Sequence, residues 1–162
     1  MPSRHEKTGD VLRLYYVDCK NFAVKTKVIV ALGSNIEPRG ERLAKALGAL
    51  AALPSTRLVK ASSVIETEPV DVPEEFAALK FMNQVAVLET ELSAREFSDR
   101  MHAIEDAQGR VRTVHNGPRT IDLDLIDFGG EKSDDPALTL PHPRARERSF
   151  VMDPLAEIGE SF

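Results

Sequence analysis

The stretch GPRTIDLDLIDFG, residues 117–129, sets two aspartates two positions apart within an otherwise apolar segment. Successive side chains of a β-strand point to opposite faces, so the apolar residues share a buried face while Asp122 and Asp124 project together from the other. Their Cα atoms lie about 6.6 Å apart in such a strand. Two carboxylates this close suit a divalent cation such as Mg²⁺. A solvated face of an antiparallel sheet has the same pattern, so the aspartates alone leave both interpretations open.

Composition places the chain among ordinary globular proteins. Of its 162 residues, 42% are hydrophobic and 29% are charged, which fits one independently folding domain. The single cysteine, Cys19, excludes an intramolecular disulfide and fits a reducing compartment. No apolar run approaches the roughly 18 residues of a membrane span, and no signal-peptide core follows the start. We therefore expect a cytoplasmic protein that does not associate with membranes.

The order of the expected helices and strands defines the fold class. Short apolar runs bounded by turn formers predict strands at residues 27–32, 57–67 and 81–89. Helical spacing of apolar residues predicts a helix at 41–53, and Ser93 caps a second helix that ends at Gly109. With the aspartate strand, the order is βαββαβ. This order predicts a ferredoxin-like α+β fold, an antiparallel sheet with both helices on one face, long catalytic loops, and the other face free to bind.

Two arginine-rich segments border the aspartate strand. The loop before it, GRVRTVHNGPRT, contains Arg110, Arg112 and Arg119 among glycine and proline. The segment LPHPRARERSF places His142 between prolines and ahead of alternating arginines. Each arginine taken singly is more often a solvated surface residue, and Arg110 also suits a charge cap at the helix end. Together, however, guanidinium groups chelate phosphate oxygens, so ATP with Mg²⁺ fits this arrangement.

Several separated motifs resemble those of one enzyme family. They are ALGSN at 31–35, ETEP…FMN at 66–83, GRVR…GPRTIDLDLIDFG at 109–129 and LPHPRARERSFVMDPL at 140–155. Over residues 28–158 the chain resembles the 6-hydroxymethyl-dihydropterin pyrophosphokinases of folate synthesis. The resemblance implies transfer of pyrophosphate from ATP to the hydroxymethyl group of a reduced pterin, with release of AMP. It also implies two Mg²⁺ ions at the paired aspartates, and it allows fusion to other folate enzymes.

The resemblance also assigns roles to individual residues. The implied metal ligands are Asp122 and Asp124. The implied mobile arginines at the transferring phosphates are Arg110 and Arg119, which complete the expected catalytic set. Further implied ATP contacts are Arg112, His142 and Arg148. The implied pterin contacts are Thr67, Glu68, Val70, Phe81, Asn83, Asn116 and Phe150. Phe81 and Phe150 fit a hydrophobic core equally well, whereas Asn83 inside an apolar strand needs a polar partner.

The chain departs from the family pattern at several positions. Asn116 stands where relatives often have tryptophan, Thr113 where a lysine often follows GRVR, and His102 where some relatives carry glutamine. Residues 1–26 show no periodicity and are expected to be an N-terminal extension or an expression remnant. Residues 27–162 are the expected pyrophosphokinase domain, which ends before the family's usual C-terminal segment and is expected to be shortened.

Two other functions match parts of the pattern. A ferredoxin-like RNA-binding module shares the topology, but FMNQVAVLE lacks the paired exposed rings that stack bases. The net charge of −5 and the acidic face also disfavour a nucleic-acid partner. A calcium loop at DLDLID lacks the glycine and glutamate that such loops require. The pyrophosphokinase therefore remains the stronger hypothesis.

Overall fold

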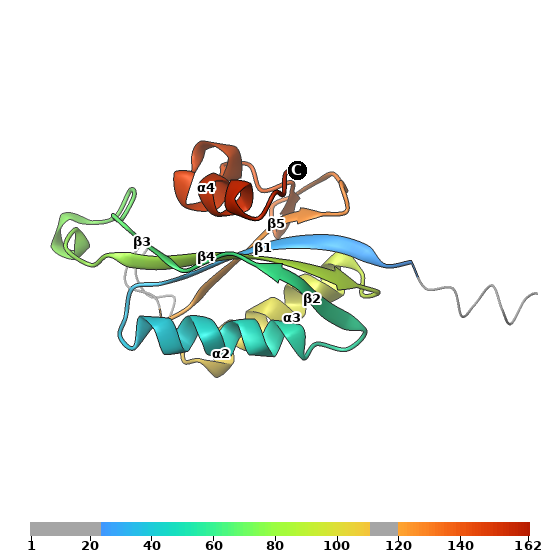
Figure 1. The fold of residues 1–162 in the computed structure, drawn as a ribbon, viewed down its shortest axis with the longest axis horizontal. Helices are drawn as coiled ribbons and strands as arrows, with labels where there is room; N and C mark the ends of the chain where they lie inside the picture. Colours follow the sequence, from blue (N-terminus) through green and yellow to red (C-terminus); the bar gives the residue numbers. More distant parts are fainter. Residues whose placement is uncertain (1–23, 111–119) are drawn as a thin grey trace, which may run out of the picture.

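An antiparallel β-sheet with helices on both faces organises the chain (Figure 1). The computed structural model describes residues 24–110 and 120–162. The strands are β1 (Thr26–Ser34), β2 (Thr56–Ala61), β3 (Ile65–Thr67), β4 (Phe81–Thr90), β5 (Asp122–Phe128), β6 (Ser133–Asp135) and β7 (Leu138–Leu140). The helices are α2 (Arg39–Ala51), α3 (Ala94–Ala107) and α4 (Ser149–Glu157), with short 3₁₀ turns η1 (Glu74–Phe76) and η2 (Ala145–Glu147).

Strand order confirms the ferredoxin-like prediction. The main sheet runs β2-β4-β1-β5, β3 pairs with the start of β4, and all these pairings are antiparallel. The helices α2 and α3 connect the strands in the expected βαββαβ sequence. β5 lies at the outer edge beside β1, where Gly33 faces Asp122 and Ala31 faces Asp124. This pairing sets the two aspartates beside the end of β1.

The segment expected as one strand at residues 57–67 is instead two strands, β2 and β3. Ser62 lies between them and is buried, with 4% of its surface exposed. Its hydroxyl accepts a hydrogen bond from the Val85 N–H at 2.9 Å, and its own N–H donates to the Val85 carbonyl at 2.9 Å. The side-chain bond takes the place of a regular ladder bond, so the strand is interrupted there.

The helices α2 and α3 cover one face of the sheet, as Figure 1 shows. Their buried stripes meet the sheet in one core cluster, which includes Leu43, Leu50, Phe97 and Met101. The Ser93 cap is confirmed, because its hydroxyl accepts from the Glu96 N–H. Gly109 follows with a positive φ of 76°, which ends the helix as expected. In the described part of the chain, every helix is too short or too polar to cross a bilayer.

The opposite face of the sheet is not free, which corrects the prediction. Helix α4 lies across it (Figure 1), and Val151 and Leu155 pack there against Ile29, Val85 and other strand residues. No helix was predicted from the sequence over residues 149–157. However, Val151 and Leu155 lie one helical turn apart, and burying them favours a helix even with Pro154 inside it. The part of this face near the aspartates lines a cleft and is not covered by α4.

The two faces of β5 divide as the alternation predicts. Ile121 and Leu123 are buried in the core on the helix side, at 0% and 5% exposure. Asp122 and Asp124 line a cleft on the other face. A bulge in the pairing with β1 follows, and Ile126 then packs in the core beneath α4. Because the bulge lies beyond the aspartates, both carboxylates stay on the same face.

Candidate active site

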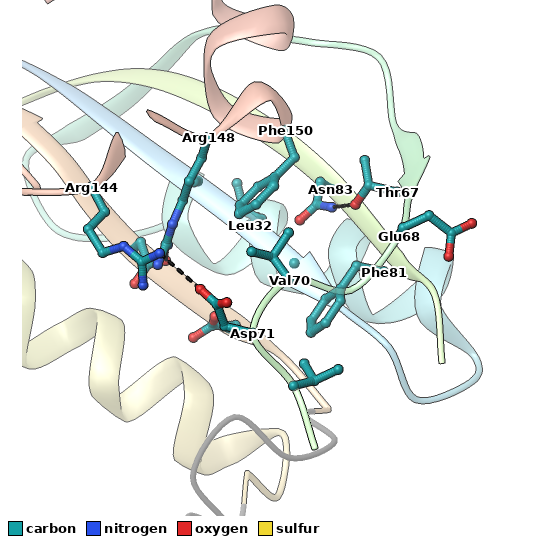
Figure 2. A pocket seen from close by; sticks show the side chains of 15 residues that line it. Leu32, Thr67, Glu68, Val70, Asp71, Phe81, Asn83, Arg144, Arg148 and Phe150 are labelled. Atoms are coloured by element: carbon teal, nitrogen blue, oxygen red, sulfur yellow. Dashed lines mark hydrogen bonds and ion pairs between the residues drawn. The ribbon is translucent and has the colours of Figure 1, made fainter. Parts of the chain in front are cut away.

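A cleft opens where the ends of β1, β4 and β5 meet the start of α4 (Figure 2). Loop residues after β3 form its outer wall. Most of the described residues expected at the site line this cleft: Thr67, Glu68, Val70, Phe81, Asn83, Asp122, Asp124, Arg148 and Phe150. Of the expected ATP contacts, Arg148 lines the cleft together with the expected pterin contacts, whereas Arg110 and His142 are not among its lining residues.

The carboxylate pair lies at one end of the cleft and is held by arginines. Arg110 Nη1 lies 2.8 Å from Asp122 Oδ1, and 19% of the Asp122 side chain is exposed. Arg148 Nη1 lies 3.7 Å from Asp124 Oδ2, and 33% of the Asp124 side chain is exposed. Among the described residues, no cluster of three or more acidic, histidine or cysteine side chains could enclose a metal. Two hard carboxylates on an accessible face nevertheless fit Mg²⁺, which commonly takes its remaining ligands from water and substrate phosphates.

Arg110 leaves the end of α3 and points to β5. Its backbone N–H donates to the Glu105 carbonyl at 3.2 Å, while its guanidinium bonds the Glu105 carboxylate as well as Asp122. Its side chain is thus shared between the helix end and the aspartate strand. Arg110 can neutralise charge at Asp122, which a simple helix cap would not do.

His142 belongs to the same end of the site. Its Nδ1 accepts a hydrogen bond from the Arg144 N–H at 3.2 Å, so the Nε2 atom carries the proton of the neutral ring. Burial lowers the pKa of His142 below its ordinary value, and the positive charge of Arg148 acts in the same direction. The negative charge of Asp122 opposes these effects. A neutral imidazole that carries its proton on Nε2 can donate a hydrogen bond from that atom to an anion.

An ion pair crosses the mouth of the cleft. Arg144 Nη2 lies 3.0 Å from Asp71 Oδ2, which joins the turn before η2 to the loop after β3 (Figure 2). Both side chains are more than half exposed. Neither residue was expected at the site, because they lie 73 positions apart in the chain.

The other end of the cleft contains two aromatic rings and an amide side chain. The rings of Phe150 and Phe81 stand on its two sides, with Val70 between them in the view of Figure 2. Asn83 is 6% exposed, and its Nδ2 donates to Thr67 Oγ1 at 2.5 Å. This bond supplies the polar partner that an amide in an apolar strand requires. Apolar faces beside a fixed amide suit a flat heterocycle with polar edges.

Gly33 and Glu105 are site residues that sequence reasoning missed. A Cβ at Gly33 would lie 2.9 Å from Asn83 Oδ1, so only glycine leaves the amide its place. Glu105 is 1% exposed beside Arg110. A glycine at the end of a strand and a carboxylate beside the buried face of α3 were the available signals. Arg112, Thr113, Asn116 and Arg119 lie outside the described residues, and their roles remain predictions.

The fold and the cleft together define a ferredoxin-like α+β domain whose cleft joins two carboxylates and two arginines to an amide and two aromatic rings. A family model matches residues 29–160, and the chain belongs to the 7,8-dihydro-6-hydroxymethylpterin-pyrophosphokinase (HPPK) family.

Curated relatives agree with this membership. A 2-amino-4-hydroxy-6-hydroxymethyldihydropteridine pyrophosphokinase of Pseudomonas aeruginosa is 42% identical over 133 residues, which cover 82% of this chain and 80% of the relative. The enzyme of the same name from Bacillus subtilis is 40% identical over 129 residues, which cover 80% of this chain and 75% of the relative.

Longer proteins share the domain. A solved structure described as HPPK-DHPS in complex with substrates matches with a TM-score of 0.62 at 12% identity, and this likeness supports the fold alone. The match covers 83% of this chain but only 40% of that chain. The folic acid synthesis protein fol1 of Pneumocystis carinii is 32% identical over 144 residues, which are 89% of this chain and 19% of the relative.

Proposed function

We propose that this cleft is where the chain carries out the reaction of its family. That reaction transfers pyrophosphate from ATP to the hydroxymethyl group of 6-hydroxymethyl-7,8-dihydropterin in folate biosynthesis, and ATP is its co-substrate. One observation carries the assignment of the site: Asp122 and Asp124 line the cleft together with the amide and rings at its other end. The polyphosphate would bind at the aspartates and the pterin between the rings.

Asp122 and Asp124 are the proposed ligands of two Mg²⁺ ions. The donor set supports this, because the carboxylates lie on one strand face and are still partly exposed. When bound, Mg²⁺ supplies charge neutralisation at the polyphosphate. The family membership implies ATP, while the metal and the number of ions belong to this proposal.

Arginines and a histidine bind the phosphates in the proposed arrangement. Arg110 and Arg148 already contact the carboxylates, so they lie next to the space for the polyphosphate. His142 donates from Nε2 to a phosphate oxygen. Arg112 and Arg119 complete this set as predictions from the sequence. Their guanidinium groups would stabilise the charge that develops during transfer.

The pterin binds at the amide end of the cleft. Asn83 offers a donor and an acceptor to the edge of the ring, and Thr67 holds the amide in place at 2.5 Å. Phe150 and Phe81 cover the faces of the ring, and Glu68 and Val70 form the outer wall. Asn116 is a further proposed contact.

The chemical step requires positioning rather than a covalent enzyme intermediate. The pterin hydroxyl oxygen forms a bond to the β-phosphorus, while the bond from that phosphorus to the α,β-bridging oxygen breaks. AMP leaves with the electron pair of that bond. Asp122 or Asp124 accepts the hydroxyl proton. Removal of water and alignment of the two substrates along the cleft support the transfer.

The cellular setting is also part of the proposal. We expect the enzyme to act in the cytoplasm, free of membranes and nucleic acid, and beside or fused to other folate enzymes. The HPPK-DHPS and fol1 relatives support the fusion, because in both the matching region is a minor part of a longer chain.

Calorimetric titration tests the assignment. A non-hydrolysable ATP analogue and then the pterin are added with and without Mg²⁺, and release of AMP from ATP is measured separately. We expect nucleotide binding that depends on Mg²⁺ and AMP release that depends on the pterin. Nucleotide binding without any dependence on metal, or no AMP release, would overturn the proposed site and reaction.

A further inference from the structure

Glu105 is a charged residue in a position that would suit an apolar one. It lies on α3 next to Ile104 and four residues after Met101, which belong to the buried stripe of the helix. Its side chain is 1% exposed. Burying a carboxylate costs free energy unless charged or hydrogen-bonded groups compensate it. The partners of Glu105 therefore indicate what the buried charge does.

Among the described residues, Glu105 has partners in β5, just after α3 and within α3 itself. Glu105 Oε2 accepts from the Leu123 N–H of β5 at 3.2 Å. The same oxygen bonds the guanidinium of Arg110. On its own helix, His102 Nδ1 lies 3.2 Å from Glu105 Oε1. Charge-assisted bonds of this kind are the stronger class of protein hydrogen bonds.

Two of these bonds lead directly to the carboxylate pair. Leu123 stands between Asp122 and Asp124 in β5, which is an outer strand of the sheet. Arg110 Nη1 also lies 2.8 Å from Asp122 Oδ1. Glu105 thus bonds both the backbone that carries the aspartates and the arginine that contacts one of them. A shift of α3 or of Arg110 relative to β5 would break at least one bond.

We propose that Glu105 is a positioning residue, which holds the Arg110 guanidinium in register with Asp122 and Asp124 for pyrophosphoryl transfer. The inference rests on the proposed function of the carboxylate pair. Glu105 itself contacts the strand backbone and Arg110 and acts on the phosphates through Arg110. A displacement of about 1 Å at a reacting centre lowers turnover by about 100-fold, so such a residue controls the rate without touching substrate.

Glu105→Gln tests the proposal with little change of shape. The amide oxygen can still accept from the Leu123 N–H, but the charge that holds Arg110 is lost. Asp99→Asn is the matched control, since it makes the same chemical change on an exposed face of α3. We expect Glu105→Gln to lower kcat by about 10- to 100-fold. Affinity for the ATP analogue should change less than about threefold. Asp99→Asn should match the wild type.

A double-mutant cycle separates positioning from a general loss of stability. If Glu105 acts through Arg110, then Glu105→Gln in an Arg110→Ala background should lower kcat by less than about twofold further. Additive losses would overturn the proposal, and so would a wild-type kcat in folded Glu105→Gln. A merely structural role would lower the melting temperature and leave kcat per folded molecule unchanged.

Glu105→Asp keeps the inference testable if the glutamine variant does not fold. The shorter carboxylate stays charged, but it cannot reach Arg110 and the Leu123 N–H in the same geometry, so kcat should again fall. An unchanged kcat in Glu105→Asp would overturn the proposal. Failure of the reaction itself is distinguishable, because the wild type would then release no AMP in the same assay.

Discussion

The guanidinium of Arg148 lies 3.7 Å from the carboxylate of Asp124 and 5.6 Å from the centre of the Phe150 ring, so the start of α4 joins both ends of the cleft. Arg148 immediately precedes the helix, and Phe150 is its second residue. Packing of α4 on the sheet therefore places a cation beside Asp124 and an aromatic ring in the cleft at once. Substitutions at this junction should separate the binding of the two substrates.

Arg148→Ala should weaken binding of the ATP analogue by about tenfold, which is about 1.4 kcal/mol. The lost group is a cation beside the proposed polyphosphate, and pterin affinity should change less. Arg146→Ala is the control, because the Arg146 guanidinium lies 4.3 Å from the centre of the Phe162 ring, and Arg146 is absent from the cleft lining. Calorimetry with each ligand measures both affinities. Equal losses in the two variants would contradict the role of Arg148.

Asp122→Ala and Asp124→Ala should each lower turnover by roughly 100-fold or more while the fold is retained. Each change removes a proposed metal ligand from a partly exposed strand face rather than from the core. Asp134→Ala, an exposed change on β6, is the control. Release of AMP is measured together with circular dichroism. Wild-type turnover in either cleft variant would refute the metal assignment.

Asn83→Ala should weaken pterin binding by about 1–3 kcal/mol, because polar groups on the ring would lose their partner inside the cleft. Affinity for the ATP analogue should barely change. Thr67→Val removes the hydroxyl that accepts from Asn83 Nδ2, and it should produce a smaller loss in the same direction. Titration with both ligands is the measurement. If affinity for the nucleotide falls as far as that for the pterin, Asn83 has a structural role.

Gly33→Ala should also weaken pterin binding, although Gly33 itself has no side chain. The new Cβ would lie 2.9 Å from Asn83 Oδ1 and 3.6 Å from Phe81 Cδ1, so it would displace the amide. Gly48→Ala is the matched control: nothing lies within 4 Å of its new Cβ, and its exposed helical position should gain up to about 1 kcal/mol of stability. Pterin affinity equal to the wild type in Gly33→Ala would show that the amide need not stay in place.

The pKa of His142 should lie below its ordinary value of about 6.5, mainly because of burial and also because of Arg148. The unfolded chain then binds more protons than the folded protein between the two pKa values. Lowering the pH through that interval should therefore reduce the free energy of unfolding, with no further effect of this group below the folded pKa. Titration of the imidazole by NMR measures the midpoint, which should rise in Arg148→Ala. A midpoint at or above 6.5 in the wild type would contradict the prediction.

Local periodicity explains why much of the fold could be predicted. The capping box at Ser93, the stripes of α2 and α3 and the alternation in β5 follow from backbone geometry that repeats every few residues. The aspartates therefore share a face whatever packs against them. In the same way, an amide within the apolar strand β4 indicated a polar partner before any contact was known.

Contacts between distant segments required the tertiary structure. Helix α4 was not predicted from the sequence, because arginines and Pro154 obscure its short apolar stripe, and that stripe becomes worth burying against the sheet face that α2 and α3 leave uncovered. Glu105 is similar. Its place beside the buried stripe of α3 can be read from the sequence, but its partner amide on β5 is 18 positions away, so no local pattern shows what it bonds.

The sequence by itself determined the order of helices and strands, the face that bears Asp122 and Asp124, and the family. The element order and the aspartate face depend on the periodicity of helices and strands, and the family depends on motifs along the chain. Only the tertiary structure decided that Thr67 holds Asn83, that Arg148 reaches Asp124, and that Glu105 joins Arg110 to β5. Hydrogen bonds and ion pairs act over a few ångströms, so their partners are chosen by how packed elements lie in space.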